Sequence, residues 1–231
     1  PRLFESQANM DEYCRIWRMI AERYAEEPII LGYELLNEPI DQKYSALYPY
    51  LQTTYQRVTA AIREVDKNHI IILDGGNFCN DFSMLNDYSF DSKIVLTGHR
   101  YNSTYVADFA QVSNSSNLPM FIGEFGHWNG GQEQNSEIVS NIISYGMGYT
   151  YWPFKKMDNW ESLLGFDSPG DWMGIQNFVN AQRDNQTQIQ NALQNVDVEK
   201  ARTAMERYLE NCKYTNCFER SNVRNGLQFG Q

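Results

Sequence analysis

The sequence predicts an α/β protein built on a parallel sheet, and two observations carry this prediction. Five short apolar runs rich in β-branched residues are spread along the 231-residue chain. Segments whose apolar residues recur at helical spacing separate these runs, so consecutive strands should be parallel and joined by right-handed crossovers. No internal repeat, linker or low-complexity tract is visible, and we expect one domain over residues 1–231.

The elements of the first half follow from spacing and from turn residues. Apolar residues at helical intervals predict a helix over residues 9–26, and a buried strand is expected over residues 29–36. An amphipathic helix should cover residues 47–65. The next strand is residues 70–73, which the turn Asp74-Gly75-Gly76 closes.

The second half repeats the alternation. Strands are expected over residues 94–98, 120–123 and 148–152, with helices near residues 104–112 and 133–145 between them. Each strand is short and β-branched or aromatic, which is typical of strands covered on both faces.

Beyond residue 152 the pattern changes to a polar, aromatic-rich loop that should last to about Gly174, followed by helices near residues 175–183 and 198–211. Five strands cannot close an eight-stranded barrel, so the sheet is either open or the C-terminal part of a larger barrel. An open nucleotide-binding sheet would need a glycine-rich phosphate loop. Gly75-Gly76-Asn77 lacks the third glycine of that motif.

The composition excludes some partners. A net charge of −10 argues against binding nucleic acid or an anionic membrane surface. No stretch approaches the roughly 20 apolar residues that span a bilayer. A neutral polysaccharide is not repelled by such a surface, and the 14% share of aromatic residues suits a sugar site as well as a packed core.

The cysteines and sequons bear on metals and on secretion. The four cysteines lack zinc-type spacing, and we expect no metal or other cofactor. Cys212 and Cys217 could close a small disulfide loop if the protein is exported. Three Asn-x-Ser/Thr sequons, which begin at Asn102, Asn114 and Asn185, weakly favour a secreted protein.

Two apolar runs each reach a glutamate where the chain is expected to turn: Glu38 after residues 30–37, and Glu124 after residues 120–123. The C-terminal ends of barrel strands hold catalytic groups, and two carboxylates on one rim are the pair that glycosidic cleavage requires. Taken singly, Glu38 is as well explained as a helix-initiating acid before Pro39, and Glu124 as an ordinary turn residue. Together they favour a catalytic pair.

Four motifs make the chain resemble glycoside hydrolase family 5, the cellulase-type (β/α)8 barrels. They are Asn37-Glu38-Pro39, His99 with Tyr101, Gly123-Glu124, and Trp152, in the order of the family's fourth, sixth, seventh and eighth strands. The resemblance covers residues 28–154 and implies a TIM barrel of which this chain holds about strands 4 to 8. The family's first three strands, with an arginine and a further histidine of the active site, would belong to a segment of the same protein before Pro1.

The resemblance also implies roles for these residues. Glu38 would be the general acid/base and Glu124 the nucleophile of a retaining reaction, with carboxyl groups about 5–5.5 Å apart. Asn37 would hold the sugar's 2-hydroxyl at the point of cleavage. Tyr101 would hydrogen-bond Glu124 and keep it aligned.

Other residues would contact the sugar. The resemblance has His99 touch sugar or a carboxylate, although a residue capping a strand end explains it too. Trp152 would form a platform beneath the sugar ring. The alternative is that it is a core residue. Trp128, Trp160 and Trp172 fall in loops expected on the same rim, where they could build further subsites or pack the loops.

The function implied is a retaining glycosidase that acts on a β-glucan or a related oligo- or polysaccharide. The alternative is an inactive carbohydrate-binding remnant, because the barrel would be incomplete. An incomplete barrel has a structural consequence that can be checked. The strand over residues 29–36 should pair with residues 70–74 but have no partner on its other edge, and the strand over residues 148–152 should also be an edge.

Overall fold

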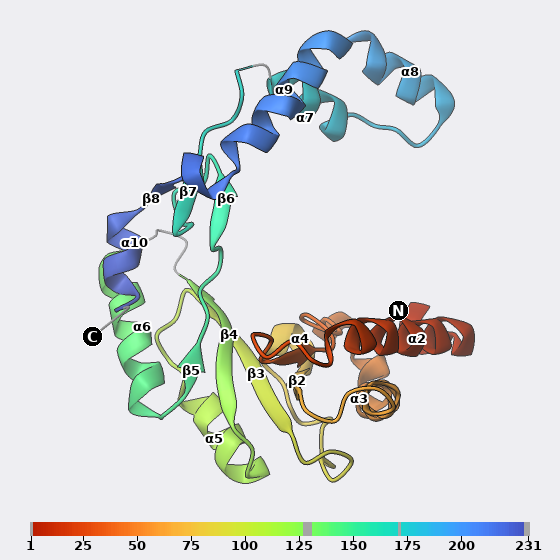
Figure 1. Cartoon of the computed structure of the whole chain (residues 1–231), viewed down its shortest axis with the longest axis vertical. Helices are drawn as coiled ribbons and strands as arrows, with labels where there is room; N and C mark the ends of the chain where they lie inside the picture. Colours follow the sequence, from red (N-terminus) through yellow and green to blue (C-terminus); the bar gives the residue numbers. More distant parts are fainter. Residues whose placement is uncertain (1, 127–130, 171, 229–231) are drawn as a thin grey trace. The chain divides into compact units, whose positions relative to one another are not determined.

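The computed structural model describes residues 2–126, 131–170 and 172–228 (Figure 1). They form two compact units, which we describe separately: one holds the described residues up to Gly126 and Glu137–Tyr151, and the other holds the rest. That both units belong to one catalytic domain stays a prediction. Among the described residues, no helix combines the length and the apolar character needed to cross a membrane.

A five-stranded parallel sheet forms the centre of the first unit. Its spatial order is the order of the sequence: β1 (Gly32–Glu34), β2 (Ile70–Asp74), β3 (Ile94–Tyr101), β4 (Met120–Gly126) and β5 (Gly148–Tyr149). Every pair of neighbours is parallel. The five predicted strands and their parallel arrangement are therefore confirmed.

Helices precede and connect these strands, and the longer ones lie close to where the apolar periodicity predicts them. They are α1 (Arg2–Glu5), α2 (Gln7–Tyr24), η1 (Gln42–Leu47), α3 (Tyr48–Arg63), α4 (Gly76–Cys79), α5 (Ala107–Ser116) and α6 (Gln132–Ser144). The start of α2 is set by Ser6, whose hydroxyl accepts the Asn9 amide proton at 3.3 Å.

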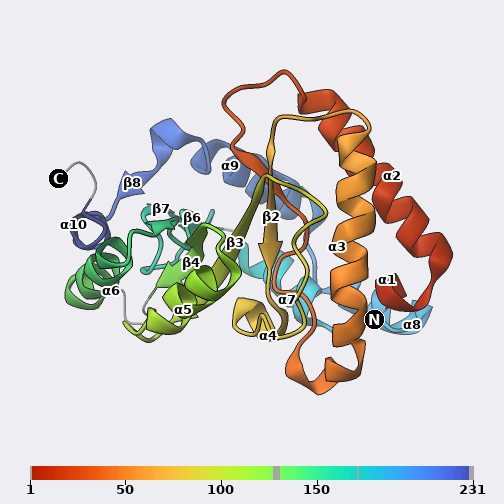
Figure 2. The same cartoon turned by 90° about the horizontal axis from the view of Figure 1, so that it is seen from below.

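Helix α3 attaches the sheet to its helical layer. Leu51, Tyr55, Val58 and Ile62 follow helical spacing and are all fully buried. Figure 2 shows α3 running alongside β2, with α2 lying against the far side of α3. The Tyr55 hydroxyl donates at 2.8 Å to the backbone carbonyl of Asp74, so α3 fixes the end of β2 directly.

The first strand is shorter than expected. Of residues 29–36, only Gly32–Glu34 form β1, while Ile29 and Leu31 are 88% and 68% exposed. Among the described residues β1 pairs only with β2, and β5 pairs only with β4, as the incomplete-barrel prediction requires. A backbone without a second neighbour has half the ladder bonds to hold it extended, which accounts for the shortened strand.

The second unit contains structure where a loop was expected. A three-stranded sheet has the order β6 (Lys155–Met157), β7 (Leu164–Phe166) and β8 (Phe218–Glu219), and its helices are α7 (Trp172–Asn180), α8 (Gln186–Gln194), α9 (Val198–Asn211), η2 (Tyr214–Asn216) and α10 (Ser221–Gly226). The prediction of a loop to Gly174 is wrong for β6 and β7. These three-residue strands are too short to show a period, and packing such as Phe166 against Tyr208, at 5.6 Å between ring centroids, holds them.

The predicted disulfide is also absent from the structure. Cys212 and Cys217 are both free thiols. The Cys217 sulfur lies against the carbonyl oxygen of Lys213, at 3.2 Å, rather than against the other sulfur.

Candidate active site

A change of register between β3 and β4 creates the site. Thr97 pairs with Phe121 and Gly98 with Ile122, but His99 pairs with Glu124, which leaves Gly123 as an extra residue in β4. Bulges of this kind re-aim side chains. Here Glu124 comes to lie opposite His99, inside β4 rather than after its end as the sequence suggested.

Gly123 is the residue that the bulge requires. A Cβ atom at this position would collide with the Thr97 hydroxyl and would lie 3.3 Å from Nε2 of His99. The glycine before Glu124 therefore leaves room for the imidazole ring.

His99 lies between the two glutamates. Its Nδ1 is 2.9 Å from Oε1 of Glu38 and 3.7 Å from Oε2 of Glu124. One carboxylate oxygen of each glutamate and this nitrogen all lie within 4.8 Å of one another. The imidazole side chain is 2% exposed, against 28% for Glu38 and 21% for Glu124, so the carboxyl groups are the atoms that solvent reaches.

Tyr101 is hydrogen-bonded to Glu124, as the resemblance implied. Its hydroxyl donates to Oε2 of the carboxylate. Burial raises the pKa of the Tyr101 phenol strongly, and the hydrogen bond to Glu124 and the charges of Glu124 and Glu38 raise it further. The phenol thus keeps its proton and serves as a donor throughout the range in which enzymes work.

The backbone that carries Glu38 is strained. Glu38 has φ +46° and Ile40 has φ +57°, and neither is a glycine. A left-handed conformation costs an L-residue about 1–2 kcal/mol, so it persists only where other contacts hold it. Two hydrogen bonds do so: the Glu38 amide donates to Oδ2 of Asp74 at 3.0 Å, and the Asn77 amide donates to the Ile40 carbonyl at 2.9 Å.

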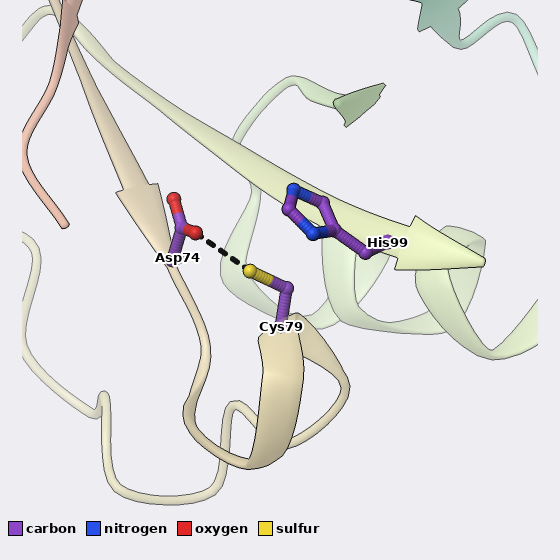
Figure 3. Close-up of side chains that lie close together, drawn as sticks. All are labelled: Asp74, Cys79 and His99. Atoms are coloured by element: carbon purple, nitrogen blue, oxygen red, sulfur yellow. Dashed lines mark hydrogen bonds between the residues drawn. The ribbon is translucent and has the colours of Figure 1, made fainter. Parts of the chain in front are cut away.

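Asp74 and Cys79 are the polar groups that the sequence analysis missed. Figure 3 shows the Cys79 thiol pointing at the Asp74 carboxyl group beside the ring of His99, with 2.6 Å between Sγ and Oδ2. The sequence does carry a signal for Asp74, which ends an apolar strand as Glu38 and Glu124 are expected to, although it also begins the turn Asp74-Gly75-Gly76. Nothing in the sequence indicated Cys79.

The electrostatics of this pair differ from those of an exposed acid. Burial and the charge of Glu34 raise the pKa of Asp74 to about 8, outweighing the hydrogen bonds from Cys79 and from the Glu38 amide. Burial likewise raises the pKa of the Cys79 thiol, with the neighbouring Asp74 adding to it. Burial also raises the pKa of Glu34.

In the part of the chain that the structure describes, two groups of side chains are close enough to be considered as metal ligands: Glu38, His99 and Glu124, and Asp74, Cys79 and His99. In the second group the 2.6 Å between Sγ and Oδ2 is a hydrogen-bond contact. Two ligands of one tetrahedral zinc ion would lie about 3.5 Å apart. In the first group, a cation would have to displace the hydrogen bond between His99 and Glu38.

The remaining predicted residues are not part of this geometry. Asn37 is exposed in the loop after β1. Trp152 and Trp160 are each 52% exposed and belong to the second unit, so their role as sugar platforms stays a prediction. Trp128 lies outside the described residues.

A partial barrel of parallel strands with paired carboxylates defines a broad class of α/β proteins, and comparison with known proteins narrows it. The family model "Cellulase (glycosyl hydrolase family 5)" matches residues 3–158. The chain therefore belongs to glycosyl hydrolase family 5.

Curated relatives match smaller parts of the chain. A β-xylosidase of Phanerodontia chrysosporium is 36% identical over 86 residues, 37% of this chain and 17% of that protein. An endoglycoceramidase of Hydra vulgaris is 39% identical over 75 residues, 28% of this chain and 14% of that protein. Endoglucanase C of Acetivibrio thermocellus is 28% identical over 144 residues, 62% of this chain and 40% of that protein. The chain thus spans less than half the length of these relatives.

Solved structures confirm the fold. An endoglucanase of Thermotoga maritima aligns with TM-score 0.55 and 20% identity, over 64% of this chain and 60% of that one. Endo-glycoceramidase II of Rhodococcus sp. aligns with TM-score 0.55 and 22% identity, over 64% of this chain and 41% of that one. The fold is accordingly that of part of a (β/α)8 barrel, as predicted.

Proposed function

We propose that this chain carries the catalytic carboxylates of a retaining glycoside hydrolase that cleaves β-glycosidic bonds in a β-glucan or a related polysaccharide. The observation that supports it best is the approach of the two glutamates, whose nearest ligand oxygens lie within 4.8 Å of each other. Retaining enzymes hold their carboxyl groups about 5–5.5 Å apart, whereas inverting enzymes leave about 6.5–9.5 Å for a water molecule.

In the first step Glu124 attacks the anomeric carbon while Glu38 protonates the departing glycosidic oxygen. Since Oε1 of Glu38 lies 2.9 Å from Nδ1 of His99, we assign the proton given to the leaving group to the other oxygen, Oε2. The C–O bond to the leaving group breaks as the ester bond to Glu124 forms.

In the second step Glu38, now a carboxylate, takes a proton from water. That water attacks the anomeric carbon and releases Glu124, so the configuration of the sugar is retained. Tyr101 orients Glu124 in both steps through its hydrogen bond. Asn37, next to Glu38 in the sequence, is proposed to hold the 2-hydroxyl.

The substrate class draws on the relatives. Structures of the Thermotoga maritima endoglucanase are described in complex with mannotriose and with cellobiose. These ligands support a β-linked glucan or mannan as the first substrates to try, with glycolipids next because endoglycoceramidases are among the relatives. A polymer of this kind is degraded outside cells, and we propose on that ground that the protein is secreted.

Trapping of the nucleophile tests the proposal. A 2-deoxy-2-fluoro aryl cellobioside or mannobioside should inactivate the protein, and mass spectrometry should place the sugar on Glu124. The variant Glu124→Gln should carry no adduct, while the matched Tyr101→Phe should still be labelled, more slowly. An adduct on another residue, or inversion of configuration in the product, would refute the assignment.

The second candidate is a carbohydrate-binding remnant that turns over nothing. Ile29 and Leu31, exposed beside β1, favour it, because a strand that pairs on one side among the described residues holds the rim less firmly. If a preceding segment of the same protein completes the sheet, adding that segment as a separate polypeptide should raise the hydrolysis of aryl β-glycosides. Binding of cello-oligosaccharides without hydrolysis, with and without that segment, would favour the remnant.

A further inference from the structure

We propose that Asp74, held by Cys79, is a positioning residue for Glu38: it fixes the left-handed backbone of Glu38 and so aims its carboxyl group at His99. The inference rests on the proposed function in one respect, since it assigns Glu38 as the acid/base. The hydrogen bonds that link Cys79, Asp74 and the Glu38 amide, which we call the clamp, can be tested without measuring turnover.

Asp74 holds the amide of Glu38. Glu38 lies in the loop after β1 with φ +46°, and its amide donates to Oδ2 of Asp74, on the neighbouring strand β2. A residue in this conformation reverts to an extended one unless its amide is held. The direction of the Glu38 side chain therefore depends on the Asp74 carboxyl group.

The turn that follows β2 has a left-handed backbone. Asn77, Phe78 and Cys79 have φ of +50°, +56° and +60°, three left-handed residues in succession. This turn brings the Cys79 thiol to the same Oδ2 that accepts the Glu38 amide, and its Asn77 amide bonds the Ile40 carbonyl. One strained turn thus holds the Glu38 loop at two points.

The burial and the protonation state of Asp74 also suit a positioning role. Asp74 and Cys79 are both fully buried, so neither can contact a sugar. Burial and the charge of Glu34 raise the pKa of Asp74 to about 8, with the charge of Glu38 adding to it. At neutral pH the group is therefore a neutral acid that can accept a hydrogen bond without adding another negative charge beside the carboxyl groups of Glu34, Glu38 and Glu124.

Leaving-group dependence separates positioning from general damage. If the Glu38 carboxyl group is misaligned, hydrolysis of aryl glycosides with poor leaving groups, which need protonation, should slow. Hydrolysis of dinitrophenyl glycosides, which do not need it, should slow less. In the full chain, Asp74→Ala should lower the ratio of kcat/KM for the poor to the good leaving group by about tenfold or more. Asp74→Asn keeps an oxygen acceptor and should stay within about threefold of the wild type.

Cys79 provides a second pair of variants if Asp74→Ala does not fold. Cys79→Ala removes the donor and should lower the same ratio by about threefold, and Cys79→Ser should restore it. Asp66→Asn, at a buried acid that makes no contact with Glu38, is the control: it should leave the ratio of the two kcat/KM values unchanged. Unchanged ratios in Asp74→Ala, or in Cys79→Ala where the former does not fold, would overturn the proposal.

A magnetic resonance measurement keeps the test independent of activity. The chain has three histidines, so the ring nitrogens of His99 can be assigned. Cys79→Ala should shift the Nδ1 resonance of His99 because the bond to Glu38 lengthens, whereas Cys79→Ser and Asp66→Asn should leave it in place. If the wild type hydrolyses nothing, the proposed function fails while this shift still supports the clamp; no shift would refute the clamp.

Discussion

The aspartates at the two ends of strand β2 show how the same type of side chain can serve opposite purposes. Just before the strand, Asp66 is buried with both carboxylate oxygens bonded: Oδ1 accepts the amides of Asn68 and His69, and Oδ2 accepts the Tyr33 hydroxyl and faces Nδ1 of His69 at 2.6 Å. Burial alone would raise the pKa of Asp66, but these hydrogen bonds outweigh it and lower the pKa to about 2.

At the other end, Asp74 is equally buried but differently surrounded. Both of its donors reach the same oxygen, and Oδ1 has no partner among the described residues. Its pKa moves the other way, to about 8. The contrast shows that burial alone does not decide the state of a carboxyl group: it is the largest cause of the raised pKa of Asp74, whereas at Asp66 hydrogen bonds to both oxygens outweigh it.

The difference between Asp66 and Asp74 follows from the end of the strand at which each lies. In α/β barrels the carboxyl ends of the strands face the site and the amino ends face the stability side. Asp66 is satisfied and charged at the stability side. Asp74 has only one of its two oxygens hydrogen-bonded and is protonated beside Glu38, where a further fixed charge would disturb the chemistry.

The sharpest test of this division is Glu124→Gln. If residues at the carboxyl ends of the strands serve catalysis and not stability, this change should lower kcat by about 10⁴-fold or more, because the nucleophile is lost. The free energy of unfolding in urea should change by no more than about 1 kcal/mol, because the group is partly exposed. A large loss of stability would show that the two purposes are not separated.

The complementary change is Asp66→Ala at the amino end. It leaves Tyr33 and His69 without their shared acceptor, and we expect the free energy of unfolding to fall by about 3 kcal/mol. Activity per folded molecule should remain near that of the wild type. A drop in kcat with unchanged stability would contradict the comparison.

Tyr101→Phe should have an intermediate effect. The half-buried hydroxyl donates to Glu124, so its loss should lower kcat by about 10- to 100-fold through misalignment of the nucleophile. Phe fills almost the same volume, and the melting temperature should change little. Tyr105→Phe, at an exposed tyrosine nearby in the sequence, is a suitable control and should leave kcat unaltered.

The last prediction concerns the pH dependence of stability, to which the two aspartates should contribute with opposite signs. Because the folded pKa of Asp74 lies above its unfolded value of 3.8, the folded state holds the extra proton between about pH 4 and 8. Its contribution to stability should therefore decrease by about 1 kcal/mol per pH unit as the pH rises through that window.

For Asp66 the sign is reversed, because its folded pKa lies below the unfolded value. Its contribution is present above about pH 4 and is lost as the pH falls towards 2. Urea titrations at several pH values should show the decline above pH 4 in the wild type but not in Asp74→Asn. A decline that survives in Asp74→Asn would assign it to other groups.

Much of the site could be predicted from the sequence because its residues occupy positions that strand periodicity and motif order determine. Glu38, His99, Tyr101 and Glu124 all lie on the carboxyl side of predicted parallel strands, and the structure brings them together. Parallel strands gather such residues at one edge whatever the sequence between them.

What escaped prediction depends on contacts distant in sequence. Cys79 reaches Asp74 only through a left-handed turn, and neither Phe78 nor Cys79 favours that conformation. Strands β6 and β7 carry three residues each, so no period is visible and tertiary packing decides their state. The predicted length of β1 failed for a related reason, since the local sequence does not tell whether a neighbouring strand is present.

The bulge at Gly123 has a consequence for how this chain can mutate. Every amino-acid replacement that a single base change in a glycine codon can make introduces a Cβ atom, and that atom meets Thr97 and the ring of His99. None of these replacements leaves the ring that separates the two glutamates undisturbed. A deep mutational scan should therefore find position 123 as intolerant as the glutamate beside it, one restricted by space and the other by chemistry.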